Sequence, residues 1–169
     1  MQVPKRKSET ARIMQRRQDY HLTPEAIEGL KREFVDLKER QRPRVAEEAQ
    51  RMREMGDLSE NAGYQSAKAQ LVRINFRLLE IEDQLKYAVL IKRGVSVSGR
   101  VQIGSTITIA RDGVERAYEI LGSEEVDLKR GRISHNSPLG AALIGHKIGD
   151  DVTLTISGRV THYRIVRVT

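Results

Sequence analysis

A long stripe of apolar residues at helical spacing constrains the fold of this chain more than any other feature. The residues recur alternately three and four positions apart, which is the seam of a coiled coil and differs from the alternation of a β-strand. They are Tyr64, Ala67, Leu71, Ile74, Leu78, Ile81, Leu85 and Ala88. The segment from about Asn61 to Lys92 is therefore predicted to form one long helix.

A second, less regular stripe precedes the first. Its members are Ile27, Leu30, Phe34, Leu37, Val45, Ala49 and Met52, with Gln41 at the one seam position that breaks the pattern. Pro43 lies inside this segment, where it removes a backbone hydrogen-bond donor. We expect it to kink the helix or to begin a new helical segment.

The ends of both arms carry their own signals. Thr23 followed by Pro24 is typical of a helix cap and first helical position, and Gly94 is predicted to end the second arm. Arms from about Thr23 to Met55 and from about Asn61 to Lys92 would each be on the order of 45 to 50 Å long. If both arms are helices, the chain reverses between them and forms an antiparallel coiled-coil hairpin.

The run Gly56–Tyr64, which reads GDLSENAGY, lies at the predicted reversal and carries two acids, Asp57 and Glu60. Their spacing fits a capping box, in which Asp57 caps the second helix and Glu60 reaches back to the backbone. That role can coexist with metal binding. The other tip residues are expected to support the turn, to pack, or to contact a partner or RNA: Gly56, Leu58, Ser59, Asn61 and Tyr64.

Composition favours two small units over one large core. The chain has 169 residues, of which 4% are aromatic and none is Trp. It has no cysteine, which excludes disulfides and thiolate sites and suits a reducing compartment. No apolar stretch approaches the roughly 20 residues that span a membrane, so we expect a cytoplasmic protein with no membrane partner.

The positive charge is concentrated near the start of the chain. Residues 1–22 hold six Lys and Arg against two acids, so about four of the net +7 belong to this arm, which we expect to be disordered. A second cationic stretch leads to the tip and contains the candidate RNA contacts Arg44, Arg51 and Arg53. Because acids are interleaved with these arginines, a solubilising helix face is the competing interpretation.

Beyond Gly94 the hydrophobic period changes from helical to two. The pattern predicts a β-hairpin from Thr106 to Leu121 through Asp112-Gly113, and a second one from Val152 to Val168 through Ser157-Gly158. Between them, Ser137-Pro138 predicts the cap of a short helix that Gly145 ends. The result is an α+β chain: a helical hairpin followed by a small antiparallel sheet with one helix.

Two long motifs, in the expected order, carry a resemblance to a known family. One is GDLSENAGY, and the other is GRISHNSPLGAALIGHKIGDDV from Gly131 to Val152. Over about residues 22–169 the chain resembles the GreA/GreB family of bacterial transcription elongation factors, the transcript cleavage factors. The resemblance implies a coiled-coil hairpin at residues 23–93 and a C-terminal domain of FK506-binding-protein-like (FKBP-like) fold at residues 95–169.

The resemblance also implies a function. In such factors the C-terminal domain docks on RNA polymerase, and the coil passes through the secondary channel to the active centre. There Asp57 and Glu60 would help the polymerase to hold Mg²⁺ and a water that cuts backtracked RNA near its 3′ end. Two carboxylates cannot hold Mg²⁺ tightly alone, because the ion prefers six oxygen ligands, so the factor would lend ligands to the polymerase without being an enzyme itself. The implied docking residues are Ser134, Ser137, Pro138, Leu139, Gly140, Asp150 and Asp151.

Two departures from the family pattern keep alternatives open. Gly63 stands where the family usually has a third acid, and the arm before about His21 has no counterpart. A protein that enters the same channel and inhibits or modulates the polymerase without cleavage is therefore the second interpretation. A prolyl isomerase or chaperone is the third, although the C-terminal domain has only Tyr118 and Tyr163 as aromatics. We expect a monomer.

The four histidines show no metal-ligand spacing along the sequence. They are His21, His135, His146 and His162. We expect each of them to serve an ordinary surface or turn role.

Overall fold

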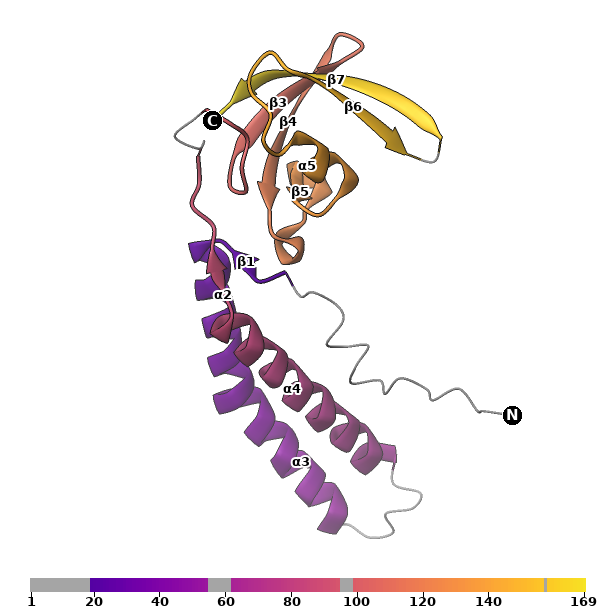
Figure 1. The fold of residues 1–169 in the computed structure, drawn as a ribbon. Coiled ribbons are helices and arrows are strands. Elements are labelled where there is room, and N and C mark those ends of the chain that lie inside the picture. Colours follow the sequence, from indigo (N-terminus) through magenta and orange to yellow (C-terminus); the bar gives the residue numbers. More distant parts are fainter. Residues whose placement is uncertain (1–18, 55–61, 95–98, 157) are drawn as a thin grey trace, which may run out of the picture.

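The computed structural model describes residues 19–54, 62–94, 99–156 and 158–169. Two long helical arms extend from one end of a small β-rich domain (Figure 1). The fold class predicted from the sequence, a helical hairpin followed by an α+β domain, is confirmed.

The first arm begins as predicted. Helix α2 (Pro24–Asp36) has Pro24 in its first turn, and the Oγ1 of Thr23 accepts a hydrogen bond from the backbone N–H of Ala26 at 3.2 Å. This cap satisfies one of the free backbone donors at the helix start. After a five-residue turn, α3 (Arg42–Glu54) continues the arm toward the tip.

The turn between α2 and α3 is a π-helix, η1 (Leu37–Gln41). Here the backbone N–H of Arg42 donates to the carbonyl of Leu37, five residues back. A proline at position 43 has no N–H, and its ring crowds the carbonyl four residues earlier. The irregularity predicted at Pro43 is therefore present as a wider turn, which leaves the arm continuous.

The second arm is shorter than predicted. Helix α4 (Ala62–Lys86) ends six residues before the expected Lys92, so Ala88 lies outside it and Gly94 does not stop it. The chain instead forms a short strand, β2 (Val89–Leu90). Strand β2 pairs in parallel with β1 (His21–Leu22), a segment that the sequence analysis assigned to the disordered arm.

Backbone hydrogen bonds explain this early helix end. The N–H of Val89 donates to the carbonyl of Tyr20 at 2.8 Å, and the N–H of Ile91 donates to the carbonyl of Leu22 at 2.9 Å. The rings of Tyr20 and Tyr87 also lie 5.5 Å apart. A pairing with the preceding segment thus satisfies groups that a longer helix would have used internally.

The predicted seam forms the core of the hairpin. Six of its members are buried: Leu37, Val45, Ala49, Ala67, Ile74 and Ile81. Leu30, Phe34, Tyr64, Leu71, Leu78 and Leu85 pack around them. Across the seam, the Nε and Nη2 of Arg77 donate to the two carboxylate oxygens of Glu33 at 2.7 and 2.9 Å. This bidentate pair links the two arms beside the packed seam, and its hydrogen bonds hold the pKa of Glu33 below its usual value.

The β-rich domain is a five-stranded sheet in the order β5-β4-β3-β7-β6. Its strands are β3 (Thr106–Arg111), β4 (Val114–Leu121), β5 (Arg132–Ser134), β6 (Asp151–Ile156) and β7 (Arg159–Val168). The two predicted hairpins, β3–β4 and β6–β7, are antiparallel as expected. Strand β5 was not predicted, and it pairs in parallel with β4, so the sheet is mixed.

Local turn chemistry explains why the predicted hairpin and helix form. Asp112 and Gly113 have φ angles of 51° and 78°, which is the conformation that a two-residue hairpin turn requires. Helix α5 (Pro138–Leu143) is capped by the Oγ of Ser137, which accepts the N–H of Gly140 at 3.0 Å. Helix α5 packs on one face of the sheet, and together they enclose a core that includes Ile107, Ile109, Ile120, Leu143 and Ile165.

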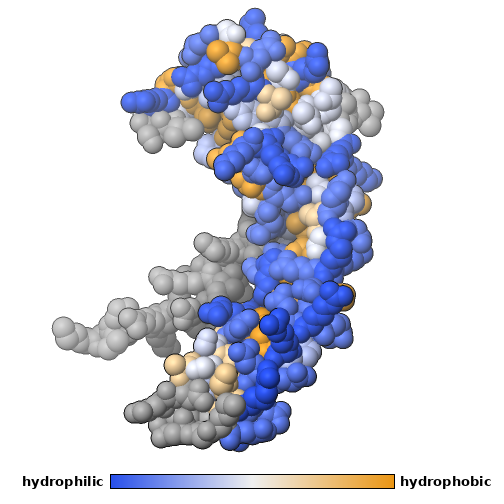
Figure 2. Space-filling model, turned by 180° about the vertical axis from the view of Figure 1, so that it is seen from behind, coloured by the Kyte–Doolittle hydropathy of each residue, from blue (hydrophilic) through white to orange (hydrophobic). Residues whose placement is uncertain are grey.

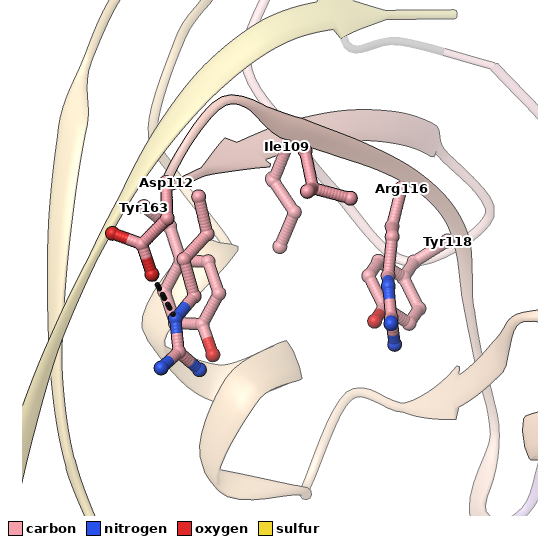
Figure 3. A pocket seen from close by; sticks show the side chains of 7 residues that line it. Ile109, Asp112, Arg116, Tyr118 and Tyr163 are labelled. Carbon is pink, nitrogen blue, oxygen red and sulfur yellow. Dashed lines mark hydrogen bonds and ion pairs between the residues drawn. The ribbon is translucent and has the colours of Figure 1, made fainter.

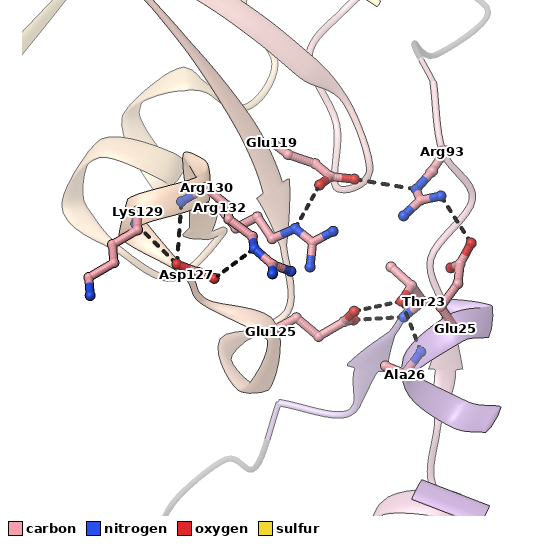
Figure 4. A network of polar contacts seen from close by, with 10 residues as sticks. All are labelled: Thr23, Glu25, Ala26, Arg93, Glu119, Glu125, Asp127, Lys129, Arg130 and Arg132. Atoms are coloured by element: carbon pink, nitrogen blue, oxygen red, sulfur yellow. Dashed lines mark hydrogen bonds and ion pairs between the residues drawn. The ribbon is translucent and has the colours of Figure 1, made fainter. Parts of the chain in front are cut away.

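A carboxylate from the β-rich domain caps the start of the hairpin (Figure 4). Glu125 lies in the 3₁₀ turn η2 (Ser123–Glu125), and its oxygens accept the backbone N–H of Thr23 at 2.7 Å and the Oγ1–H of Thr23 at 2.5 Å. Thr23 is only 2% exposed. The first turn of α2 therefore depends on a residue far away in the sequence.

Two further contacts join the hairpin to the β-rich domain. Arg93 bridges Glu25 of α2 at 3.0 Å and Glu119 of β4 at 3.3 Å. A side chain at Gly122 would meet the carbonyl oxygen of His21 at 1.9 Å, so only glycine allows the two backbones to approach so closely. Together with Glu125, these contacts fix the base of the helical hairpin, a rod formed by α2, η1, α3 and α4.

We predict that Glu125→Ala destabilises the protein by about 1 to 3 kcal/mol, because it leaves the buried N–H of Thr23 without its acceptor. The matched control is Glu124→Ala, since Glu124 is exposed and forms none of the hydrogen bonds or ion pairs found among the described residues. Urea denaturation measures both changes. Equal free energies of unfolding for the two variants would show that the Glu125 cap does not stabilise the junction.

Candidate functional site

The predicted catalytic tip falls largely outside the described residues. Helix α3 ends at Glu54 and α4 begins at Ala62. The predicted site residues between them are Gly56, Asp57, Leu58, Ser59, Glu60 and Asn61, and they lie outside the described ranges. The structure does place the end of α3 and the start of α4, which flank these residues, at the end of the rod farthest from the β-rich domain (Figure 1).

The residues that begin α4 are described. Tyr64 is half-buried and packs on the coiled-coil core, as its seam position predicted. Together with Ala49, Gln50 and Arg53 of α3 it lines a shallow groove beside the tip. Gly63, which the sequence analysis identified as a departure from the expected third acid, lies half-exposed in the first turn of α4.

The candidate RNA contacts form a cationic approach to the tip. Arg44, Arg51 and Arg53 are all exposed on α3. None of the ion pairs found among the described residues involves them. Exposed guanidinium groups can bind phosphates, so both the RNA-contact and the solubility interpretation stay open.

The face of the rod seen from behind is strongly polar. Figure 2 shows hydrophilic side chains along most of the hairpin in this view, and more apolar side chains on the β-rich domain. A helical hairpin with a buried seam and a charged surface can extend into solvent or into a water-filled channel.

The predicted docking residues around α5 build the fold of the C-terminal domain. Ser134 and Gly140 are buried, and the Oγ of Ser137 donates to the carbonyl of Ser134 at 2.6 Å. Leu139 packs against the core, and Pro138 occupies the first turn of α5. These contacts explain why residues 137–140 fold as the capped first turn of α5. Docking by these residues stays a prediction.

The two predicted docking acids differ in their surroundings. Asp150 accepts the backbone N–H of Lys147 at 2.8 Å, and this hydrogen bond, with a further one from His146, lowers the pKa of Asp150. Asp151 forms a bidentate pair with Arg164 at 2.9 Å for both contacts. The first acid closes a turn, and the second is an exposed ion pair between neighbouring strands.

The sequence analysis missed a hollow on the sheet (Figure 3). Side chains from β3, β4, β7 and the β3–β4 turn line it, and Figure 3 shows Arg116 and Tyr118 on the side opposite Asp112 and Tyr163. Its lining residues are Ile109, Arg111, Asp112, Val114, Arg116, Tyr118 and Tyr163. The Nε of Arg111 is 3.1 Å from Asp112, whereas Arg116 forms none of the ion pairs found in the described part of the chain. A hollow of this kind can accept an apolar side chain flanked by an acid.

None of the helices in the described ranges is both long enough and apolar enough to cross a bilayer.

Family models match both parts of the chain. The model for the transcription elongation factor N-terminal domain matches residues 20–90, and the model for the GreA/GreB C-terminal domain matches residues 96–169. These spans correspond to the helical hairpin with β1 and β2, and to the β-rich domain.

Several curated relatives are transcription elongation factors named GreA. The factor of Thermomicrobium roseum is 38% identical over 148 residues, which cover 87% of this chain and 95% of the relative. The factor of Alkalilimnicola ehrlichii is 39% identical over 150 residues, with the same coverage of both chains. The factor of Thioalkalivibrio sulfidiphilus is 41% identical over 152 residues, which cover 86% of this chain and 96% of the relative.

Among solved structures, GreA factor homolog 1 (Gfh1) of Thermus thermophilus is 26% identical and aligns over 90% of this chain and 99% of its own, with a TM-score of 0.40. Because the curated relatives match nearly from end to end and both domain models match in order, this chain belongs to the GreA/GreB family of transcription elongation factors.

Proposed function

We propose that this protein is a transcription elongation factor that binds RNA polymerase and stimulates the polymerase's own cleavage of backtracked RNA. The observation that carries the proposal is a packed helical hairpin attached to a separate β-rich domain, with Asp57 and Glu60 between its two arms in the sequence, in a chain that spans about 95% of GreA relatives. In this role the protein is an accessory factor that acts in the cytoplasm as a monomer.

The rod supports this proposal through its length and stiffness. Helix α4 has 25 residues, which corresponds to about 37 Å at 1.5 Å per residue. Its seam is packed along both arms, and the Arg77–Glu33 pair links the arms beside it. Such a rod can carry the residues between α3 and α4 into a narrow channel while the β-rich domain stays outside.

The chemistry at the tip requires the polymerase. Mg²⁺ prefers near-octahedral oxygen coordination and keeps several waters, so Asp57 and Glu60 supply only part of a site. In a two-metal centre the ions stabilise the attacking and the leaving oxygen of a phosphodiester. On this proposal the polymerase holds one Mg²⁺, and the tip acids recruit a second ion together with the attacking water.

A second candidate function is modulation of the polymerase without cleavage. The observation that favours it is Gly63 in the first turn of α4, where the family pattern has a third acid. The isomerase interpretation has less support, because the hollow on the sheet offers two tyrosines among three charged side chains.

We predict that the double variant Asp57→Asn, Glu60→Gln lowers stimulated RNA cleavage by on the order of 100-fold, because amides can cap a helix but do not attract Mg²⁺ strongly. Cleavage is measured on stalled elongation complexes, and polymerase binding is measured in parallel. The control is Glu54→Gln, which removes a neighbouring charge at the end of α3. An amide variant that cleaves at the parental rate would rule out the metal-ligand role.

Gly63→Glu is expected to increase cleavage roughly 3- to 10-fold at limiting Mg²⁺, because a third carboxylate raises the local affinity for the cation. Gly63→Ala is the control, since it shares the gain in helix propensity, up to about 1 kcal/mol, without the charge. A magnesium titration compares the three proteins. If the two variants behave alike, position 63 acts through helix stability only.

We also propose that the hollow on the sheet contributes to docking on the polymerase, because its apolar lining and its arginines suit an apolar side chain next to an acid. Arg116→Glu is expected to weaken polymerase binding about 10-fold or more, because it reverses a charge at the rim of the hollow. The control is Arg159→Glu, which makes the same exposed charge change at the start of β7, away from the residues that line the hollow. Equal affinities of the two variants, measured by fluorescence anisotropy, would place docking elsewhere on the domain.

A further inference from the structure

Three potential metal ligands meet where the N-terminal strand contacts the β-rich domain. Asp19 precedes β1, His21 lies in β1, and His135 follows β5. The Nδ1 of His21 is 2.8 Å from the Oδ1 of Asp19, and the Nδ1 of His135 is 3.3 Å from the Oδ2 of Asp19. The three ligand atoms all lie within 4.8 Å of one another.

The carboxylate of this cluster is buried and held in place. The side chain of Asp19 is 4% exposed, and it accepts the backbone N–H of Ser123 at 2.6 Å and that of His21 at 3.1 Å. A carboxylate oxygen ligand is therefore already positioned by these two backbone donors.

The two imidazoles leave a path from solvent. The side chain of His135 is 15% exposed and that of His21 is 35% exposed. Their rings meet edge to face with centroids 5.0 Å apart. This arrangement shields the carboxylate while it keeps one side open, as a three-ligand metal site with a water in the fourth position requires.

We propose that Asp19, His21 and His135 form a binding site for a divalent transition-metal cation of the Zn²⁺ class. Two imidazole nitrogens and one carboxylate oxygen are a ligand set typical of Zn²⁺, whereas Mg²⁺ prefers oxygen ligands alone. This site is distinct from the tip acids in both ligand chemistry and location.

The geometry needs only a small adjustment to accept the ion. Tetrahedral coordination at 2.0 to 2.1 Å places ligand atoms about 3.3 Å apart. The Nδ1 of His21 lies 2.8 Å from the Oδ1 of Asp19, and the Nδ1 of His135 lies 3.3 Å from the Oδ2 of Asp19. Both separations are close to this value, and a small turn of the carboxylate would present one oxygen to an ion held by both histidines. The Nδ1 of His135 also lies 3.3 Å from the carbonyl oxygen of Leu121. Metal binding would replace the proton that a neutral Nδ1 shares with Asp19 or with that carbonyl, so that the lone pair of each Nδ1 faces the cation.

A metal at this point would connect parts of the chain that are distant in sequence. His21 pairs with Val89 of β2 at the base of the hairpin, and His135 belongs to the β-rich domain. The ion would reinforce the junction that Glu125 and Arg93 already form. Its consequence is a fixed angle between rod and domain, independent of any chemistry at the tip.

Equilibrium dialysis of the full chain against Zn²⁺ tests the proposal, with bound metal measured after exchange. The parent protein is expected to bind about one Zn²⁺ at this site, and Co²⁺ in its place is expected to give the visible spectrum of a tetrahedral centre. At free Zn²⁺ 100-fold above the dissociation constant, Tm is expected to rise by about 5 to 10 °C.

Two variants remove the site in different ways, so that a folding defect in one does not decide the result. His135→Asn and Asp19→Asn are each expected to lose the bound Zn²⁺ and the metal-dependent rise in Tm. His162→Asn, which removes an exposed histidine from the same domain, and the Asp57→Asn, Glu60→Gln variant are expected to retain both.

Circular dichroism in the presence of EDTA checks that the variants share the parental fold. Absence of saturable Zn²⁺ binding to the parent protein would overturn the proposal. So would parental binding by both cluster variants, because the metal would then lie elsewhere on the chain.

Discussion

The packed seam between the two arms is the constraint on which the rest of the structure depends. A helix of 25 residues with an apolar stripe is stable only if that stripe is covered, and here the first arm covers it. The π-turn before Pro43 lets the first arm continue as a helix along the whole seam. The seam sets the distance between the β-rich domain and the far ends of α3 and α4. Under the proposed function, this distance is what allows Asp57 and Glu60 to reach the active centre of the polymerase.

The base of the rod matters as much as its length. Glu125 caps α2 from the β-rich domain, Arg93 bridges both parts, and β1 pairs with β2 beneath them. The far end of the rod has a defined position only if its base is fixed on the β-rich domain. The proposed function therefore assigns the two parts complementary roles. The β-rich domain docks on the polymerase and orients the rod, and the rod brings carboxylates that complete a metal site within the polymerase.

Local patterns predicted most of the fold, and non-local contacts account for what was missed. The seam, the Thr23 cap, the Asp112-Gly113 turn and the Ser137 cap each depend on neighbours in sequence, and each is present. The end of α4 at Lys86 and the parallel strand β5 depend on partners far along the chain. The cluster of Asp19, His21 and His135 was missed for the same reason, since spacing along the sequence cannot bring His21 next to His135. The predicted tip acids lie outside the described residues, so their geometry stays a prediction.

The central claim is that the acidic tip makes the polymerase cut its own backtracked transcript. The most direct test adds this protein to stalled elongation complexes that carry a labelled RNA, and follows RNA length and restart after nucleotide addition. The account predicts shortened transcripts, released 3′ fragments and resumed elongation. Transcripts that keep their full length while the protein is bound to the polymerase would contradict it.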